Sequence, residues 1–157
     1  MGDTNPLRVD AALYGERYRE DFLTQYRDFV ASADKISERR NAANSFFMLG
    51  NTTLIGITGY LTGVGEGHLW LVALAGMAFS VTWRLLIESY RSLNTAKFAV
   101  IHDMEQHLPL ATYDAEWAHI QAVGSYKPFS AVESWVPLVF VVLHGVVACI
   151  NLATILG

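Results

Sequence analysis

Lysine and arginine are absent from two parts of this chain, the short connection 62–68 and the tail 135–157. Of the eleven basic residues, seven precede the first long apolar run and four fall between the second run and the third. Lysine and arginine near membrane spans are retained on the cytoplasmic side. The bias therefore predicts a membrane protein with its N-terminus in the cytoplasm and its C-terminus outside.

Cysteine is nearly absent too, because Cys149 is the only one, and an intrachain disulfide is excluded. The net charge of -4 argues against nucleic acid as a partner, since nucleic acid selects basic faces. The chain lacks a Gly-rich phosphate loop and the HExxH, CxxC and GxSxG signatures. We therefore predict no enzymatic activity, no catalytic residues and no cofactor. A cleavable signal peptide is not visible, because the first forty residues are highly charged.

The composition indicates that part of the chain lies in lipid and part in water. The chain is 52% hydrophobic, which is too apolar for an ordinary soluble domain, yet 17% of its residues are charged. We predict an all-α integral membrane protein with three transmembrane helices and a cytoplasmic amphipathic helical bundle.

Residues 1–40 are predicted to form a cytoplasmic amphipathic helix, because apolar side chains recur at spacings of three or four. This face is expected to pack on the cytoplasmic extension of the second span. A helix lying on the membrane surface is the alternative, but the polar face mixes acids with bases and such helices are usually basic there. The residues predicted to make these cytoplasmic helix contacts are Tyr18, Phe22, Phe29, Tyr90 and Ile101.

Residues 41–64 are predicted to form the first transmembrane helix, since about 20 residues at 1.5 Å each cover the hydrocarbon core. This segment is unusually rich in glycine, asparagine and threonine. Small residues let helix backbones approach each other, and polar residues need partners in lipid. We expect this helix to face protein rather than lipid.

The second span is predicted at 69–108, with a long cytoplasmic extension that Pro109 ends. Trp83 and Arg84 are taken to mark the inner membrane interface. Residues 109–131 form a cytoplasmic elbow, in which Asp114 is expected to cap a short helix that ends near Gly124. The third span is predicted at 132–157.

His144 lies halfway along the third span, where ionisable groups are rare and face protein or water. It is either a proton-sensing or pore-lining group, or a neutral histidine bonded to a neighbouring helix. Polar residues at the inner end of the first span either pair between helices or line a central opening. The candidates for an oligomer interface or a pore are Asn44, Asn51, Gly56, Gly59, Gly63, Arg84 and His144.

Metal binding is not predicted. Glu116 and His119 have the Glu-x-x-His spacing of di-iron bundles, but such sites need a second copy and further carboxylates. His102 and Glu105 have the reverse order. Both pairs are interpreted as a solvated polar face.

Two strings carry a family resemblance. One runs from Ser37 to Phe47 as SERRNAANSFF and is followed by Asn51-Thr52; the other begins WRLLIESYRSLN at Trp83 and continues to Leu108-Pro109. They resemble the RipA-type octameric membrane protein family of bacteria over roughly residues 12–140. The resemblance implies a cytoplasmic (inner) membrane protein that assembles into a large homo-oligomer, and some members are linked to fitness under stress. It supplies no catalytic residues.

Two functions are consistent with these features. The first is a homo-oligomeric scaffold or pore-like assembly in the bacterial inner membrane, in contact with lipid and with copies of itself. The alternative is a membrane-perturbing effector or partner-binding subunit of a defence or stress-signalling system, with an unidentified cytoplasmic protein partner. The chain has a looser similarity to the two-span effector modules of nucleotide-signalling defence systems, from which its third span departs.

Overall fold

The computed structural model describes residues 9–64, 69–124 and 132–156, and every regular element in these ranges is a helix. This confirms the all-α prediction for the described part of the chain. The helices are α1 (Ala11–Tyr14), α2 (Tyr18–Val64), α3 (Leu69–Glu105), α4 (Thr112–Val123) and α6 (Val136–Leu156).

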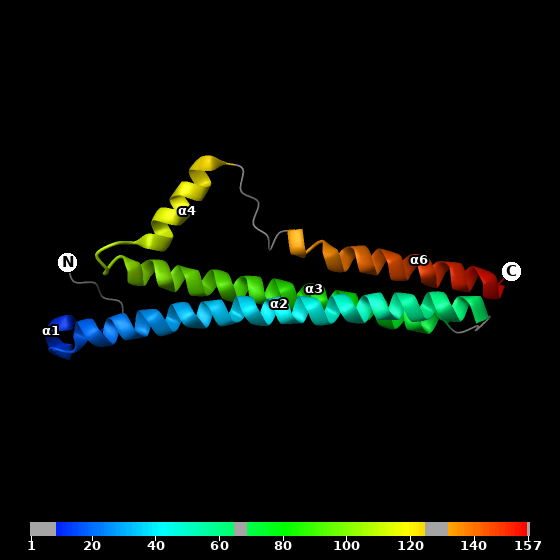
Figure 1. The fold of residues 1–157 in the computed structure, drawn as a ribbon, viewed down its shortest axis with the longest axis horizontal. Coiled ribbons are helices and arrows are strands. Elements are labelled where there is room, and N and C mark those ends of the chain that lie inside the picture. The colour runs from blue at the N-terminus through cyan, green and yellow to red at the C-terminus, as the bar shows by residue number, and fades with distance from the viewer. Residues whose placement is uncertain (1–8, 65–68, 125–131, 157) are drawn as a thin grey trace.

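Helices α2 and α3 run side by side in opposite directions and form a long hairpin (Figure 1). With 47 residues at 1.5 Å each, α2 is about 70 Å long. The last helix, α6, packs along the half of α3 that is nearest the hairpin turn, while α4 projects from the other end of α3 (Figure 1). The apolar half of the hairpin is therefore a three-helix layer, and the charged half is a helix pair with α4 attached.

The N-terminal helix differs from the prediction at both of its ends. It is interrupted after α1 at Gly15, whose φ of +97° lies in the left-handed region that favours glycine. From Tyr18 onward α2 continues without a break through position 40 into the predicted first span. The change of composition at 40 does not interrupt the helix, because no glycine or proline near it disturbs the backbone hydrogen bonds.

Two described helices are long and apolar enough to cross a membrane, α3 and α6, rather than the three that the sequence predicted. The segment 41–64 is not among them, since its asparagine, threonine and glycine residues lower its mean hydropathy. Only 17% of the apolar window of α6 and 28% of that of α3 are buried within the chain. A core helix of a soluble protein would be mostly buried, so these two helices present apolar side chains outward.

The apolar core lies where α2, α3 and α6 meet. Phe47, Trp83 and Ile87 are buried there, and Phe79 and Phe140 pack against them. The Phe47 and Trp83 rings stack with centroids 6.0 Å apart. Trp83 is only 2% exposed, so its ring fills this core instead of lying at the lipid headgroups as the sequence suggested.

The charged half of the hairpin has a smaller core in which α2 packs on the cytoplasmic extension of α3. Ala33 and Ile36 of α2 are buried, and Ile101 of α3 is completely so. Tyr18 and Phe22 stack on each other, and the Phe22 ring meets His107 edge to face. The Lys97 ammonium lies 4.3 Å from the centre of the Phe29 ring. The apolar stripe of the N-terminal segment thus faces α3.

Candidate functional site

Four polar residues join the three helices at the inner end of the apolar half. The indole N–H of Trp83 donates to Asn44 Oδ1 at 2.9 Å, and the Asn44 amide donates to Glu133 Oε1 at 3.1 Å. The other Glu133 oxygen lies 3.4 Å from Nε of Arg40, and both side chains are largely buried. Since Glu133 lies just before α6, this cluster fixes where α6 enters the three-helix layer.

A second buried cluster lies seven residues further along α2. Asn51 Oδ1 accepts from the Ser80 hydroxyl at 2.6 Å and faces His144 Nε2 at 3.1 Å. All three side chains are at most 1% exposed. The Asn51 amide group donates to the Phe47 carbonyl, which orients its oxygen toward the other two residues. Because that oxygen is an acceptor, His144 carries a proton on Nε2.

Gly76 makes room for His144. A Cβ atom at Gly76 would lie 2.5 Å from both nitrogens of the His144 ring, and this distance is shorter than any that Cβ atoms normally make with their neighbours. The ring therefore packs directly on the α3 backbone, as small residues permit between membrane helices.

The polar residues of α2 that face the other helices repeat every seven positions, at Asn44, Asn51 and Thr58. Thr58 is buried, and its hydroxyl donates to the Leu54 carbonyl of its own helix. Asn151 of α6 does the same to Val147. A polar seam thus runs inside the protomer. The bonds of Asn44 and Asn51 join different helices, and such interhelical hydrogen bonds fix how the helices are aligned along one another.

The opposite face of α2 has no partner within the described chain. Leu49, Thr52, Gly56 and Gly59 are exposed there, and a Cβ added at Gly56 or Gly59 would meet nothing within 4 Å. Glycine costs helix stability relative to alanine, roughly 1 kcal/mol per position. Packing inside the protomer does not account for these two glycines.

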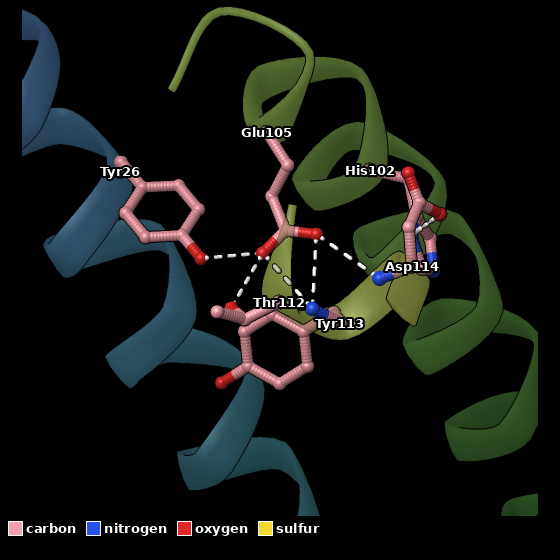
Figure 2. A network of polar contacts seen from close by, with 6 residues as sticks. All are labelled: Tyr26, His102, Glu105, Thr112, Tyr113 and Asp114. Atoms are coloured by element: carbon pink, nitrogen blue, oxygen red, sulfur yellow. Dashed lines mark hydrogen bonds and ion pairs between the residues drawn. The ribbon is translucent and has the colours of Figure 1, made fainter. Parts of the chain in front are cut away.

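A third polar cluster joins α3 to α4 at the charged end of the molecule (Figure 2). The Glu105 carboxylate is 1% exposed and accepts hydrogen bonds from the Tyr26 and Thr112 hydroxyls, both at 3.0 Å. It also accepts from the backbone N–H groups of Tyr113 and Asp114 at 3.1–3.2 Å. These amides belong to the first turn of α4, where four N–H groups have no partner within a helix.

Glu105 therefore caps α4 from a different helix. The residue at the N-cap position, Ala111, makes no side-chain cap bond, and Asp114, which the sequence suggested as the cap, lies inside the first turn. The far end of α4 is as predicted, with Gly124 in the left-handed conformation. Glu105 is buried, which corrects its interpretation as part of a solvated face.

The electrostatics of this cluster follow from its geometry. Burial raises the pKa of Glu105, but the hydrogen bonds from Tyr113, Thr112, Asp114 and Tyr26 together hold that pKa below its ordinary value. Burial and the neighbouring carboxylate raise the pKa of the Tyr26 phenol. Glu105 is thus an anion at neutral pH, and the Tyr26 hydroxyl keeps its proton and donates a hydrogen bond to it.

An open groove of about 640 Å³ runs between α3 and α4. Arg40 and Arg91 stand on its walls with Asn94, Phe98 and Trp117. Trp117 is half exposed. The walls of this groove combine aromatic side chains with basic and amide groups.

The residues singled out in the sequence lie in different surroundings. Asn44, Asn51 and His144 are inside the protomer, whereas Gly56 and Gly59 are on its surface. Arg84 pairs with Glu88 four residues on in the same helix at 3.0 Å. Gly63 lies in the last turn of α2, where side-chain surroundings fall outside the described residues. Tyr90 is half-buried.

Sequence reasoning missed Gly76 and Ser80, which meet His144 and Asn51. Both lie in an apolar run, and nothing in their local sequence distinguishes them. Glu105 was noticed only for its spacing from His102. The signal for its capping role is the start of α4, where Ala111 at the N-cap position offers no side-chain acceptor to the amides of Tyr113 and Asp114.

Fold and site together define an all-helical protein with two outward-facing apolar helices of membrane-crossing length. The octameric membrane protein family (8xMP) has a family model that matches residues 23–153, most of the chain, so this protein belongs to that family. It is a membrane protein of a family described as octameric. No curated protein and no solved structure matches the chain.

Proposed function

We propose that this chain is one subunit of a homo-oligomeric assembly in the bacterial inner membrane that acts as a scaffold or pore-like structure, with a role in stress adaptation. The observation that carries the proposal is the free face of α2, defined by Leu49, Thr52, Gly56 and Gly59. A glycine-rich, hydroxyl-bearing face is typical of contacts between membrane helices and poorly suited to lipid.

The same face supports a third membrane crossing by the 41–64 part of α2. This segment runs beside the apolar half of α3, so it lies at the same membrane depth if α3 crosses the bilayer. Its inward polar groups are bonded within the protomer, and its outward face would be covered by a neighbouring copy. A segment that is protected on both sides can cross at a lower hydropathy than one that faces lipid.

The distribution of basic residues supports an N-terminus in the cytoplasm and a C-terminus outside. The end of the molecule with the Glu105 cluster would then project into the cytoplasm. Within the described residues the thiol of Cys149 is exposed whereas His144 is buried, which argues against a Cys–His nucleophile pair.

The proposal is tested by replacing the exposed glycines. Gly56→Leu and Gly59→Leu should each reduce the native mass of the detergent-solubilised particle. A glycine lets the α2 backbone approach a helix of the neighbouring copy closely, and a leucine side chain would keep the two backbones apart. Ala153→Leu, a matched enlargement at an exposed position of α6, should leave the mass unchanged. Glycine variants that retain the wild-type particle mass would contradict the proposal.

The groove between α3 and α4 favours the second candidate, a membrane effector or partner-binding subunit that receives a cytoplasmic signal. An effector that perturbs the membrane should depolarise cells when overproduced, and Trp117→Ala in the groove wall should abolish that effect. Overproduction without any loss of membrane potential would exclude it.

A further inference from the structure

We propose that His102, Glu105 and Asp114 form a binding site for one divalent transition-metal ion, which fastens the start of α4 to the end of α3. The coordinating atoms of these three residues lie within 4.8 Å of one another. His102 and Glu105 are one helical turn apart on α3, and Asp114 comes from the first turn of α4 (Figure 2). The site lies within a single chain and does not depend on the assembly proposed above.

The negative charge around the site favours the binding of a cation. Glu105 and Asp114 bring two carboxylates together, and Glu116 follows two positions after Asp114 in α4. Among the residues that the structure describes, none of these three carboxylates pairs with a lysine or arginine. An excess of negative charge in a partly dry region is stabilised when a cation binds there.

His102 provides an independent indication. Its Nδ1 is buried and lies in direct contact with a carboxylate oxygen of Asp114. A lone pair on that nitrogen and a carboxylate oxygen are two donors to the same cation. A metal ion coordinated by both would take the place of the proton that these two atoms otherwise share.

Glu105 can contribute a third ligand if the ion takes the place of one hydrogen bond at Oε2. Its Oε1 atom accepts from Tyr26, Thr112 and Tyr113, while Oε2 accepts from Asp114 and shares the Tyr113 amide. Each carboxylate oxygen has two lone pairs, and Oε2 accepts two hydrogen bonds against three at Oε1, so Oε2 is the oxygen that can exchange a hydrogen bond for the ion. Figure 2 shows Oε2 on the side that faces Asp114.

The surroundings have the features of a metal site. Hydrogen bonds from Tyr26 and Thr112 hold the Glu105 carboxylate in place, as second-layer partners hold metal ligands elsewhere. The His102 and Asp114 side chains are 28% and 46% exposed, which leaves a way in for the ion and room for water to complete the coordination.

The ligand chemistry indicates the class of metal. One imidazole nitrogen with two carboxylate oxygens suits Zn²⁺, Mn²⁺ or Fe²⁺, whereas Ca²⁺ and Mg²⁺ prefer sets made only of oxygen. A bound ion would add a direct link between α3 and the start of α4, and would thereby fix one end of the groove.

The test is a titration of the full-length, chelator-stripped protein in detergent with Zn²⁺ or Co²⁺, alongside Mg²⁺. We expect one transition-metal ion per chain, a Co²⁺ visible absorption band, and no comparable Mg²⁺ binding. His102→Ala and Asp114→Asn should each weaken binding at least tenfold. His119→Ala, which removes an exposed histidine of α4, should bind as the wild type does.

A fold-independent readout accompanies the titration, because a variant that disrupts α4 would also lose binding. Zn²⁺ should slow amide hydrogen exchange in residues 112–116 of the wild type, and it should not do so in Asp114→Asn, whose metal-free exchange should match that of the wild type. No transition-metal binding by the wild type, or undiminished binding by both His102→Ala and Asp114→Asn, would overturn the proposal.

Discussion

The absence of a side chain at Gly76 lets the His144 ring pack against the backbone of α3. The ring is 1% exposed and its Nε2 proton points to Asn51. The histidine that the sequence offered as either a sensor or a structural residue is thus bonded to a neighbouring helix within the protomer. Its partner could not be predicted, because the pairing depends on the relative register of α2 and α6, which no local pattern encodes.

Gly76→Ala should destabilise the protomer. The added methyl would overlap the His144 ring, and overpacking of this kind costs roughly 1–3 kcal/mol. The loss should appear as a lower midpoint of thermal unfolding in detergent.

Gly145→Ala is the matched control, because its added carbon would meet only the Met77 sulfur at an ordinary 3.7 Å. That variant should be as stable as the wild type or more so, since alanine favours helix. His144→Ala should largely rescue Gly76→Ala by removing the clash. Equal stability of the two glycine variants would show that Gly76 is not a contact position.

Trp83→Phe should weaken the inner cluster while keeping its ring packing. The variant lacks the indole N–H, so Asn44 Oδ1 loses the hydrogen bond that Trp83 donates to it. An unpaired buried acceptor costs about 1–3 kcal/mol. Denaturant unfolding should show that loss, and Trp135→Phe, at an exposed position, should show none.

At the scale of helices, the sequence predicted the pairing of the charged halves of α2 and α3, because apolar residues on both recur at helical spacing. The continuity of α2 through position 40 was not predicted, since a change in composition was taken for a change of element. The cap of α4 was assigned to Asp114 because capping signals are local in sequence, whereas the residue that caps α4 lies eight and nine positions before the two amides it binds.

Glu105→Gln should loosen the start of α4. The NH₂ group of the glutamine side chain would face backbone N–H groups that need an acceptor. The hydrogen bonds lost are bonds to a charged group, which contribute roughly 1.5–3 kcal/mol. Amide exchange in residues 112–116 should accelerate, while exchange in residues 46–58 should not change. Unaltered exchange in α4 would show that the cap contributes little.

In chelator-stripped protein the same cap should be sensitive to acid. The pKa of Glu105 is lowered from 4.5 in the folded chain, so its contribution to stability is complete above that value. The contribution is lost as pH falls through the lower, folded pKa. The rate of amide exchange in α4, once corrected for the intrinsic pH dependence of exchange, should therefore rise only below about pH 4.5. In Glu105→Gln the corrected rate should not change with acid.

At the scale of the whole molecule, two apolar helices and membership of the octameric family agree with the membrane protein that the sequence predicted. The family could be recognised from the strings SERRNAANSFF in α2 and WRLLIESYRSLN in α3. The number of helices that qualify as spans differed because the 41–64 part of α2 is apolar in some positions and polar in many others. A hydropathy average treats all faces of a helix alike, whereas this one has a bonded inner face and a free outer face.

The free face of α2 predicts which residues meet where two copies of the chain pack together. Single-particle imaging of the wild-type protein in lipid nanodiscs measures the number and arrangement of the copies most directly. We predict a closed ring, of eight copies as the family description states, in which Gly56 and Gly59 of each α2 touch a neighbouring chain. A monomeric particle, or a ring in which both glycines face lipid, would contradict the account.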